Sequence, residues 1–369
     1  MIIWRQMMVG FHFKQWEGVQ MMLRGLRRLI HTGFVSSEGM RPWLGTLVVL
    51  VLTAVSEGCD GRKEFSLGHE LKPQSMEELS ALSEADLERV DVGRMNLICA
   101  RATGCGAAFE VADLVRELDV WAEKARQYEM RYRKTFERNP SRYDNSYAKY
   151  RAVNLALMVN VEMKCRYQKH LMQTGAMDDV LSPRFFRNPD DVFISGLLRK
   201  RRGTCSSFPV LLAALGRRLG YPLYLRLTFG HMFCQWDDGV ERFNIETNGD
   251  GVDTPDEAYY LEEMRQGARL HPNTDADGDR LMVKLSNAEA LSVFLETAGY
   301  CLEANGRVAE AIRCYKQAVK YRPRCVNLRR LSERRVNHSC RTFSQAMMDE
   351  AKRRNHNNDR RCKCDNKCN

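Results

Sequence analysis

The 369-residue chain is 44% hydrophobic and 28% charged, which excludes a disordered chain and predicts at least one buried core in two or three folded parts. Its net charge of +10 comes mostly from basic clusters near the two ends that carry no interleaved aromatic residues, so nucleic-acid binding is not predicted. The 13 cysteines are odd in number and scattered, which argues against a disulfide framework.

An apolar run near the N-terminus resembles the central part of a signal peptide. Residues 43–55 (WLGTLVVLVLTAV) follow a compact basic start at Met40, and Cys59 lies four residues past the run. We interpret 1–39 as an N-terminal extension upstream of the true start and 40–59 as a signal-like or lipoprotein-like segment. An extracytoplasmic chain held at a membrane surface is therefore expected. The alternative is a short buried helix in a cytoplasmic chain.

The segment 75–190 is predicted to be all-helical. Ser75-x-x-Glu78 fits a capping box, and Ser83-x-x-Asp86 is a second signal of the same kind. Apolar residues recur at three- and four-residue spacing in three stretches, 95–100, 111–132 and 147–167. Asn139-Pro140 separates the last two, and the helical pattern continues to about residue 171.

The segment 191–285 changes from a helical to a strand pattern. Residues 204–219 are apolar nearly all round, with Thr204 placed to cap a buried helix and Gly220 placed to end it. Three strands are then expected at 223–229, 231–236 and 242–246, the last two joined through the Asp-Gly turn at 238–239. One buried helix followed by antiparallel strands is an α+β pattern.

Residues 286–323 match a tetratricopeptide repeat with Leu295 at the usual tryptophan position. The match depends on the spacing of Gly299, Ala311, Tyr315, Ala318 and Pro323. A single repeat cannot bury its apolar face alone, so this helical hairpin is expected to dock on the core or on another chain, with Tyr315 buried. The basic, polar segment 324–369 is predicted to be a disordered tail.

Three residues of the core have the chemistry of a cysteine triad. A thiol is nucleophilic only as the thiolate, which a helix N-terminus and a nearby imidazolium stabilise. Cys205 is expected in the first turn of the buried helix, after Gly203, which would let the backbone approach a substrate closely. His231 opens a strand and Glu246 ends its neighbour, so the order predicts nucleophile, base and orienting carboxylate.

The stretches GTCSSFPVLLAALGRRLGYP (203–222), GHMFCQW (230–236) and RFNIE (242–246) resemble the transglutaminase-like superfamily. The resemblance implies a papain-type fold with Cys205 as nucleophile, His231 as base and Glu246 in the place of the family's aspartate. It covers roughly residues 190–260. The helical segment from Asp91 to Leu171 looks like the N-terminal part of related bacterial proteins of unassigned function.

Two functions from different classes remain open. The first is a cysteine acyl-transfer enzyme that hydrolyses or transamidates an amide of a protein or peptide, without a cofactor. The backbone N–H of Cys205 is its first candidate oxyanion donor. The second is a non-catalytic scaffold whose repeat recruits a protein partner.

No metal site is predicted. Cys234 lies three residues from His231 on a strand, so the two side chains point to opposite faces. The cluster of Cys362, Cys364 and Cys368 near the C-terminus is interpreted as incidental.

Overall fold

The computed structural model of the chain describes residues 70–168, 171, 183–228, 230–247, 252–262 and 280–333, all in one compact unit. The predicted extension 1–39, the signal-like segment 40–59 and the cysteine cluster at 362–368 lie outside the described residues. Within the described ranges, no helix has both the length and the apolar character needed to cross a membrane.

Helices joined by short loops dominate residues 76–162. They are α4 (Met76–Ala81), α5 (Glu84–Leu87), α6 (Val92–Ala102), α7 (Val111–Arg138), a 3-10 turn (Pro140–Tyr143), α8 (Tyr147–Leu157) and a π-helical turn (Met158–Glu162). The side chains of Ser75 and Ser83 cap α4 and α5 as predicted. The Glu78 carboxylate, however, accepts the N–H of Gln74, so the reciprocal half of the capping box does not form.

The predicted helix 147–167 ends early, which corrects the all-helical interpretation of 75–190. Lys164 adopts a left-handed conformation (φ 57°), and Arg166 and Tyr167 then form the short strand β1 (Arg166–Tyr167). This strand pairs in parallel with β2 (Arg202–Gly203), and Tyr167 lies opposite Gly203. Pairing across such a distance in sequence overrides the local helical pattern.

Three short helices lead from this region to the core helix. They are α10 (Pro183–Phe186), α11 (Pro189–Val192) and α12 (Ile194–Lys200), and the core helix is α13 (Phe208–Arg218). Helix α13 begins at Phe208, four residues later than predicted, but it ends as predicted. Gly220 has φ +74°, and the N–H of Tyr221 closes the helix on the Gly216 carbonyl at 2.8 Å.

The sheet has the predicted antiparallel strands in the order β3-β4-β5. Its strands are β3 (Leu223–Leu227), β4 (Met232–Asp237) and β5 (Arg242–Ile245). Leu225, Cys234 and Ile245 are in register on the face that packs on α13. The predicted turn is present, with Gly239 at φ +83°. A further helix spans 257–262.

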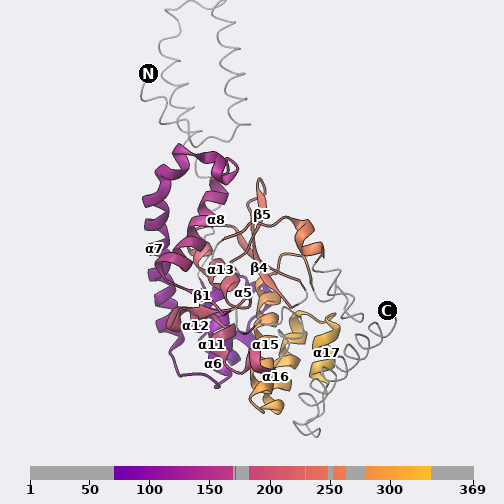
Figure 1. Cartoon of the computed structure of the whole chain (residues 1–369). Helices are drawn as coiled ribbons and strands as arrows, with labels where there is room; N and C mark the ends of the chain where they lie inside the picture. The colour runs from indigo at the N-terminus through magenta and orange to yellow at the C-terminus, as the bar shows by residue number, and fades with distance from the viewer. Residues whose placement is uncertain are drawn as a thin grey trace, which may run out of the picture. The chain divides into compact units, whose positions relative to one another are not determined.

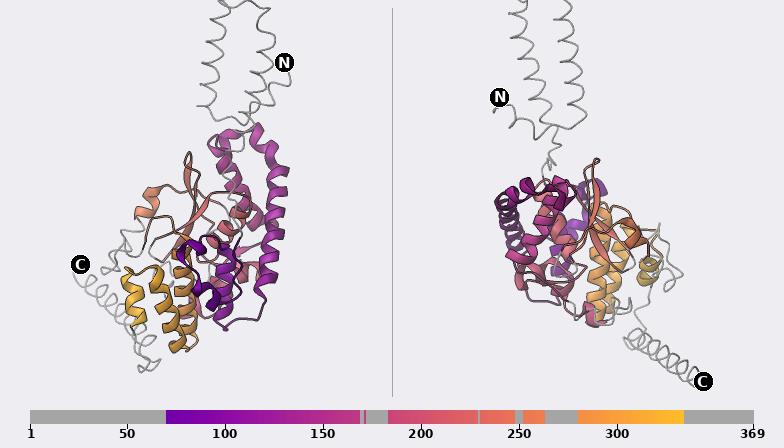
Figure 2. Two further views of the ribbon diagram at one scale, coloured as in Figure 1. Left: turned by 180° about the vertical axis from the view of Figure 1, so that it is seen from behind. Right: turned by 45° about the horizontal axis from the view of Figure 1, so that its top comes forward.

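The C-terminal helices lie on the opposite side of the unit from α7, and α6 packs against both α7 and α15 (Figures 1 and 2). They are α15 (Asn287–Ala304), α16 (Val308–Tyr321) and α17 (Val326–Ser332). The predicted hairpin is confirmed, Tyr315 is 1% exposed, and α15 packs against α6 and α10. The prediction of a disordered tail from residue 324 is wrong for α17. The buried side chains of Leu328 and Leu331 pack this helix against α16.

The described part is thus a mixed helical and sheet structure, in agreement with an α+β class.

Candidate functional site: a cysteine, histidine and glutamate cluster

Cys205 lies in a turn that leads into α13, not in the first helical turn as predicted. The hydrogen bonds of Thr204 explain the difference. Its hydroxyl donates to the Asp191 carbonyl at 2.9 Å and accepts the N–H of Ser206, so it organises the turn before the helix. The thiol therefore lies just beyond the helix N-terminus and is 3% exposed.

Gly203 is required by packing within the protein. A Cβ atom at this position would lie 2.4 Å from Ser207 Oγ and 2.8 Å from the Leu197 side chain. Packing alone therefore explains why residue 203 is a glycine. The predicted close approach of a substrate to its backbone is not needed. Gly203 also pairs with Tyr167 of the neighbouring strand β1.

His231 is positioned by a tight turn between β3 and β4. Gly230 has φ +70°, a conformation that L side chains rarely adopt, and the His231 carbonyl accepts the N–H of Thr228 at 2.9 Å. The ring Nε2 lies 2.7 Å from Oε1 of Glu246, and the Cys205 thiol is close enough to the ring to raise its pKa. The structure therefore brings the three predicted residues together.

Glu246 follows β5 and is 4% exposed. Its backbone pairs with Asp253 in an isolated antiparallel bridge, with N–H to carbonyl distances of 2.9 and 3.2 Å. Its Oε1 also accepts the hydroxyl of Tyr260 at 2.7 Å, and the Tyr260 ring stacks on Phe233 at 3.9 Å between centroids. Two donors and a bridged backbone thus fix this carboxylate beside the imidazole.

The surroundings of His231 favour its charged form. Burial alone would lower the pKa of the imidazole, but hydrogen bonds with Cys205 and Glu246, and the charge of Glu246, together raise the pKa well above its usual value. Cys165 and Cys234 are buried thiols in different surroundings. Burial raises the pKa of Cys165 to about 12 and also raises that of Cys234.

Cys234 is separate from the cluster. Its thiol donates to the Pro209 carbonyl at 3.0 Å, on the side of the sheet that packs on α13. Among the residues that the structure describes, no group of three or more His, Cys, Asp or Glu side chains is arranged to hold a metal ion.

Two tyrosines of the cluster were missed by the sequence analysis. Tyr167 accepts the backbone N–H of Cys205 at 3.2 Å, and Tyr260 donates to Glu246. Tyr167 falls inside a helical pattern, and Tyr260 lies beyond the last predicted strand. Neither position carries a local signal that would have linked it to Cys205 or Glu246.

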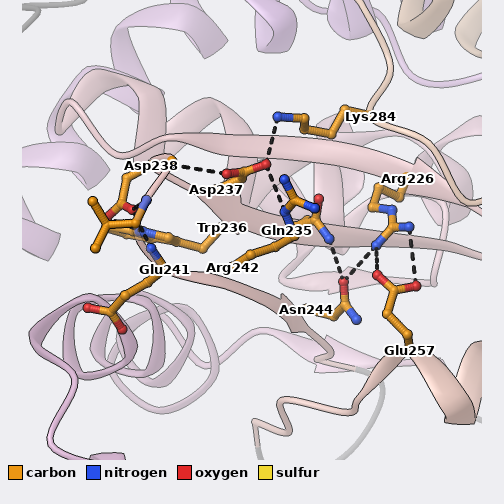
Figure 3. Close-up of polar contacts among 12 residues, drawn as sticks. Arg226, Gln235, Trp236, Asp237, Asp238, Glu241, Arg242, Asn244, Glu257 and Lys284 are labelled. Atoms are coloured by element: carbon orange, nitrogen blue, oxygen red, sulfur yellow. Dashed lines mark hydrogen bonds and ion pairs between the residues drawn. The ribbon is translucent and has the colours of Figure 1, made fainter.

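A buried arginine attaches the helix at 257–262 to the sheet. Arg226 is 5% exposed, lies over the ring of Phe233, and forms an ion pair with Glu257 (Figure 3). It also hydrogen bonds the Asn244 side chain, at 3.1 Å, and the carbonyl of Met282. Because Tyr260 belongs to the helix of Glu257, this network supports the hydroxyl that contacts Glu246.

A cavity of about 370 Å³ opens beside the cluster. Its lining is formed by Glu246, Asp253, Thr254, Pro255 and Tyr259. Of the three clustered residues, Glu246 is the one in this lining, and the space is large enough for a side chain of a substrate.

Comparisons with protein-family models, with curated proteins and with solved structures found no significant match.

Proposed function

We propose that the protein is a cysteine acyl-transfer enzyme of the transglutaminase-like, papain-type class. The observation that carries the proposal is the contact of one imidazole with both a thiol and a buried carboxylate, Cys205, His231 and Glu246. This is the arrangement in which a base activates a nucleophile while a third group fixes the base's orientation. A core helix beside a short antiparallel sheet agrees with the proposed papain-like fold.

The reaction begins with the thiolate of Cys205 and the imidazolium of His231. The sulfur attacks an amide carbonyl, forming the C–S bond and moving the carbonyl π electrons to oxygen. When the tetrahedral intermediate collapses, the C–N bond breaks and His231 donates its proton to the departing amine. Water or a second amine then attacks the thioester, His231 accepts the attacking group's proton, and the thiolate leaves.

Hydrolysis and transamidation share the thioester and differ in what resolves it. The cavity bordered by Glu246 and Asp253 offers a place for the resolving group. Carboxylates at its wall suit an amine, and a protein or peptide amide is the substrate class that fits the first step.

The test is formation of a thioester at Cys205 from a small activated ester, p-nitrophenyl acetate, followed by mass spectrometry. We expect acetylation of Cys205 in the full chain, strong slowing in His231→Ala, and none at this position in Cys205→Ser. Faster loss of the acetyl group on adding glycine methyl ester would indicate transamidation. Equal acetylation of Cys205 in the wild type and in His231→Ala would contradict the proposal and leave the scaffold alternative.

A further inference from the structure

Tyr167 is in contact with both the thiol and the backbone amide of Cys205, which lies 38 positions later in the sequence. Its hydroxyl oxygen accepts the Cys205 N–H at 3.2 Å, and the Cys205 side chain is close enough to raise the pKa of the hydroxyl. That N–H is the group expected to stabilise a developing oxyanion on the substrate. Tyr167 therefore occupies the position where such an oxygen would bind.

The backbone and the ring of Tyr167 are both held in place. Strand β1 pairs with β2, so Tyr167 lies opposite Gly203, and the next residue donates its N–H to the Gly203 carbonyl at 2.9 Å. The ring packs against Phe208 at the start of α13, with 6.0 Å between centroids. The side chain of Gln168 is anchored separately by Asp191, at 2.7 Å. The hydroxyl is thus fixed relative to the nucleophile.

The Tyr167 hydroxyl keeps its proton. Burial, and then the adjacent Cys205, raise its pKa far above the usual value for tyrosine, and the nearby Glu246 acts in the same direction. A hydroxyl that stays neutral beside a thiolate remains a donor throughout the reaction.

We propose that the Tyr167 hydroxyl and the Cys205 backbone N–H together form the oxyanion hole of this site. The inference rests on the proposed function. As the sulfur attacks, the carbonyl oxygen enters between the two groups, the N–H turns from Tyr167 to that oxygen, and the Tyr167 O–H turns from sulfur to the same oxygen. No proton leaves Tyr167, and both bonds revert when the C–N bond breaks.

Two reactions of the same thiol separate this role from a purely structural one. Iodoacetamide is displaced at a saturated carbon, so its rate reports the thiolate and its access without any oxyanion. Thioester formation from p-nitrophenyl acetate passes through a tetrahedral oxyanion. For Tyr167→Phe we expect thioester formation to slow by about 10²- to 10³-fold, as for loss of one oxyanion donor, and alkylation to change far less.

Tyr260→Phe is the matched control, because it removes a hydroxyl from the Glu246 carboxylate instead of from Cys205. We expect it to slow both reactions alike. If Tyr167→Phe also slows both alike, Tyr167 only positions the thiol and the inference is overturned. It is overturned as well if thioester formation is unchanged or faster, which would mean that the tyrosine merely covers the thiol.

A second variant avoids dependence on the folding of Tyr167→Phe. Replacing Tyr167 by a fluorinated tyrosine keeps the ring and hydroxyl but acidifies the phenol. The hydroxyl remains a donor, so thioester formation should stay close to the wild-type rate, and slowing as large as that of Tyr167→Phe would refute the inference. Equal thioester formation in the wild type and in His231→Ala would instead overturn the proposed function itself.

Discussion

Nε2 of His231 lies 2.7 Å from Oε1 of Glu246, an oxygen that also accepts the Tyr260 hydroxyl at 2.7 Å. Both atoms are largely buried, so water screens their interaction poorly. We expect Glu246→Gln to lower the pKa of His231, because the substitution removes the negative charge that favours the imidazolium. The measurement is the pH dependence of the His231 ring-proton shift, assigned with His231→Ala.

The same substitution has a defined effect on stability. The folded-state pKa of His231 is raised, so its contribution is fully present below the unfolded value of about 6.5 and is lost as pH rises through the folded value. A tenfold difference in proton affinity between the folded and unfolded states corresponds to about 1.4 kcal/mol. The stability difference between the wild type and Glu246→Gln should therefore shrink with rising pH. A difference that grows with pH would contradict the pairing.

Alkylation of Cys205 should follow the charge state of its imidazole partner. We expect Cys205 to react with iodoacetamide faster than any other described cysteine, because the charged His231 stabilises its thiolate. In His231→Ala the alkylation of Cys205 should slow and lose the pH dependence that His231 imposes. Because Cys205 is only 3% exposed, the variant is compared with the wild type and not with a free thiol. Labelling at each pH is quantified by mass spectrometry.

Cys234→Ser is the control for this experiment. The Cys234 thiol donates to the Pro209 carbonyl and burial raises its pKa, so its loss should leave the alkylation of Cys205 unchanged. Slowing as large as that of His231→Ala would refute the assigned roles.

The ion pair of Arg226 and Glu257 should couple local stability to reactivity. Glu257→Ala leaves the buried guanidinium without its carboxylate, at a cost of about 1–3 kcal/mol. We also expect slower thioester formation at Cys205, because the helix that carries Tyr260 loses its anchor. Urea unfolding and the ester assay measure the two effects.

Arg226→Met combined with Glu257→Ala completes a double-mutant cycle. The double variant should lose less unfolding free energy than the two single variants together, by about 0.5–3 kcal/mol, because it leaves no buried charge unpaired. Simple additivity would show that the contact in Figure 3 does not stabilise the fold.

Elements whose signals are complete within a few residues were predicted closely from the sequence. Alternation of Leu223, Leu225 and Leu227 and the Asp-Gly turn located the sheet closely, because both patterns are complete within a few residues. The cluster of Cys205, His231 and Glu246 followed from the order of these elements.

Features that depend on distant contacts escaped the sequence analysis. Strand β1 has two residues and is defined by its pairing with β2, so a helical period around it was misleading. The start of α13 was set by hydrogen bonds of Thr204 to a distant carbonyl, which no spacing shows. Tyr167 reaches Cys205 only through that pairing.

Gly299 and Tyr315 are in contact across the α15–α16 hairpin. A Cβ atom at Gly299 would lie 2.2 Å from the Tyr315 ring, which is 1% exposed and hydrogen bonds Glu303 at 2.9 Å. The ring therefore has little room to move away. Although alanine favours a helix by about 1 kcal/mol over glycine, we expect the clash to dominate and Gly299→Ala to destabilise the protein by about 1–3 kcal/mol in urea unfolding.

Gly106→Ala is the matched control for Gly299→Ala, because a Cβ atom at Gly106 meets nothing within 4 Å and the residue does not have a positive φ. Its effect should stay within about 0.5 kcal/mol. Adding Tyr315→Ala to Gly299→Ala should remove the clash and recover part of the lost stability, although the smaller side chain also leaves a cavity. If Gly299→Ala is instead as stable as the wild type, the hairpin packs less closely than the structure indicates, and the contact between Gly299 and Tyr315 is not essential to the fold.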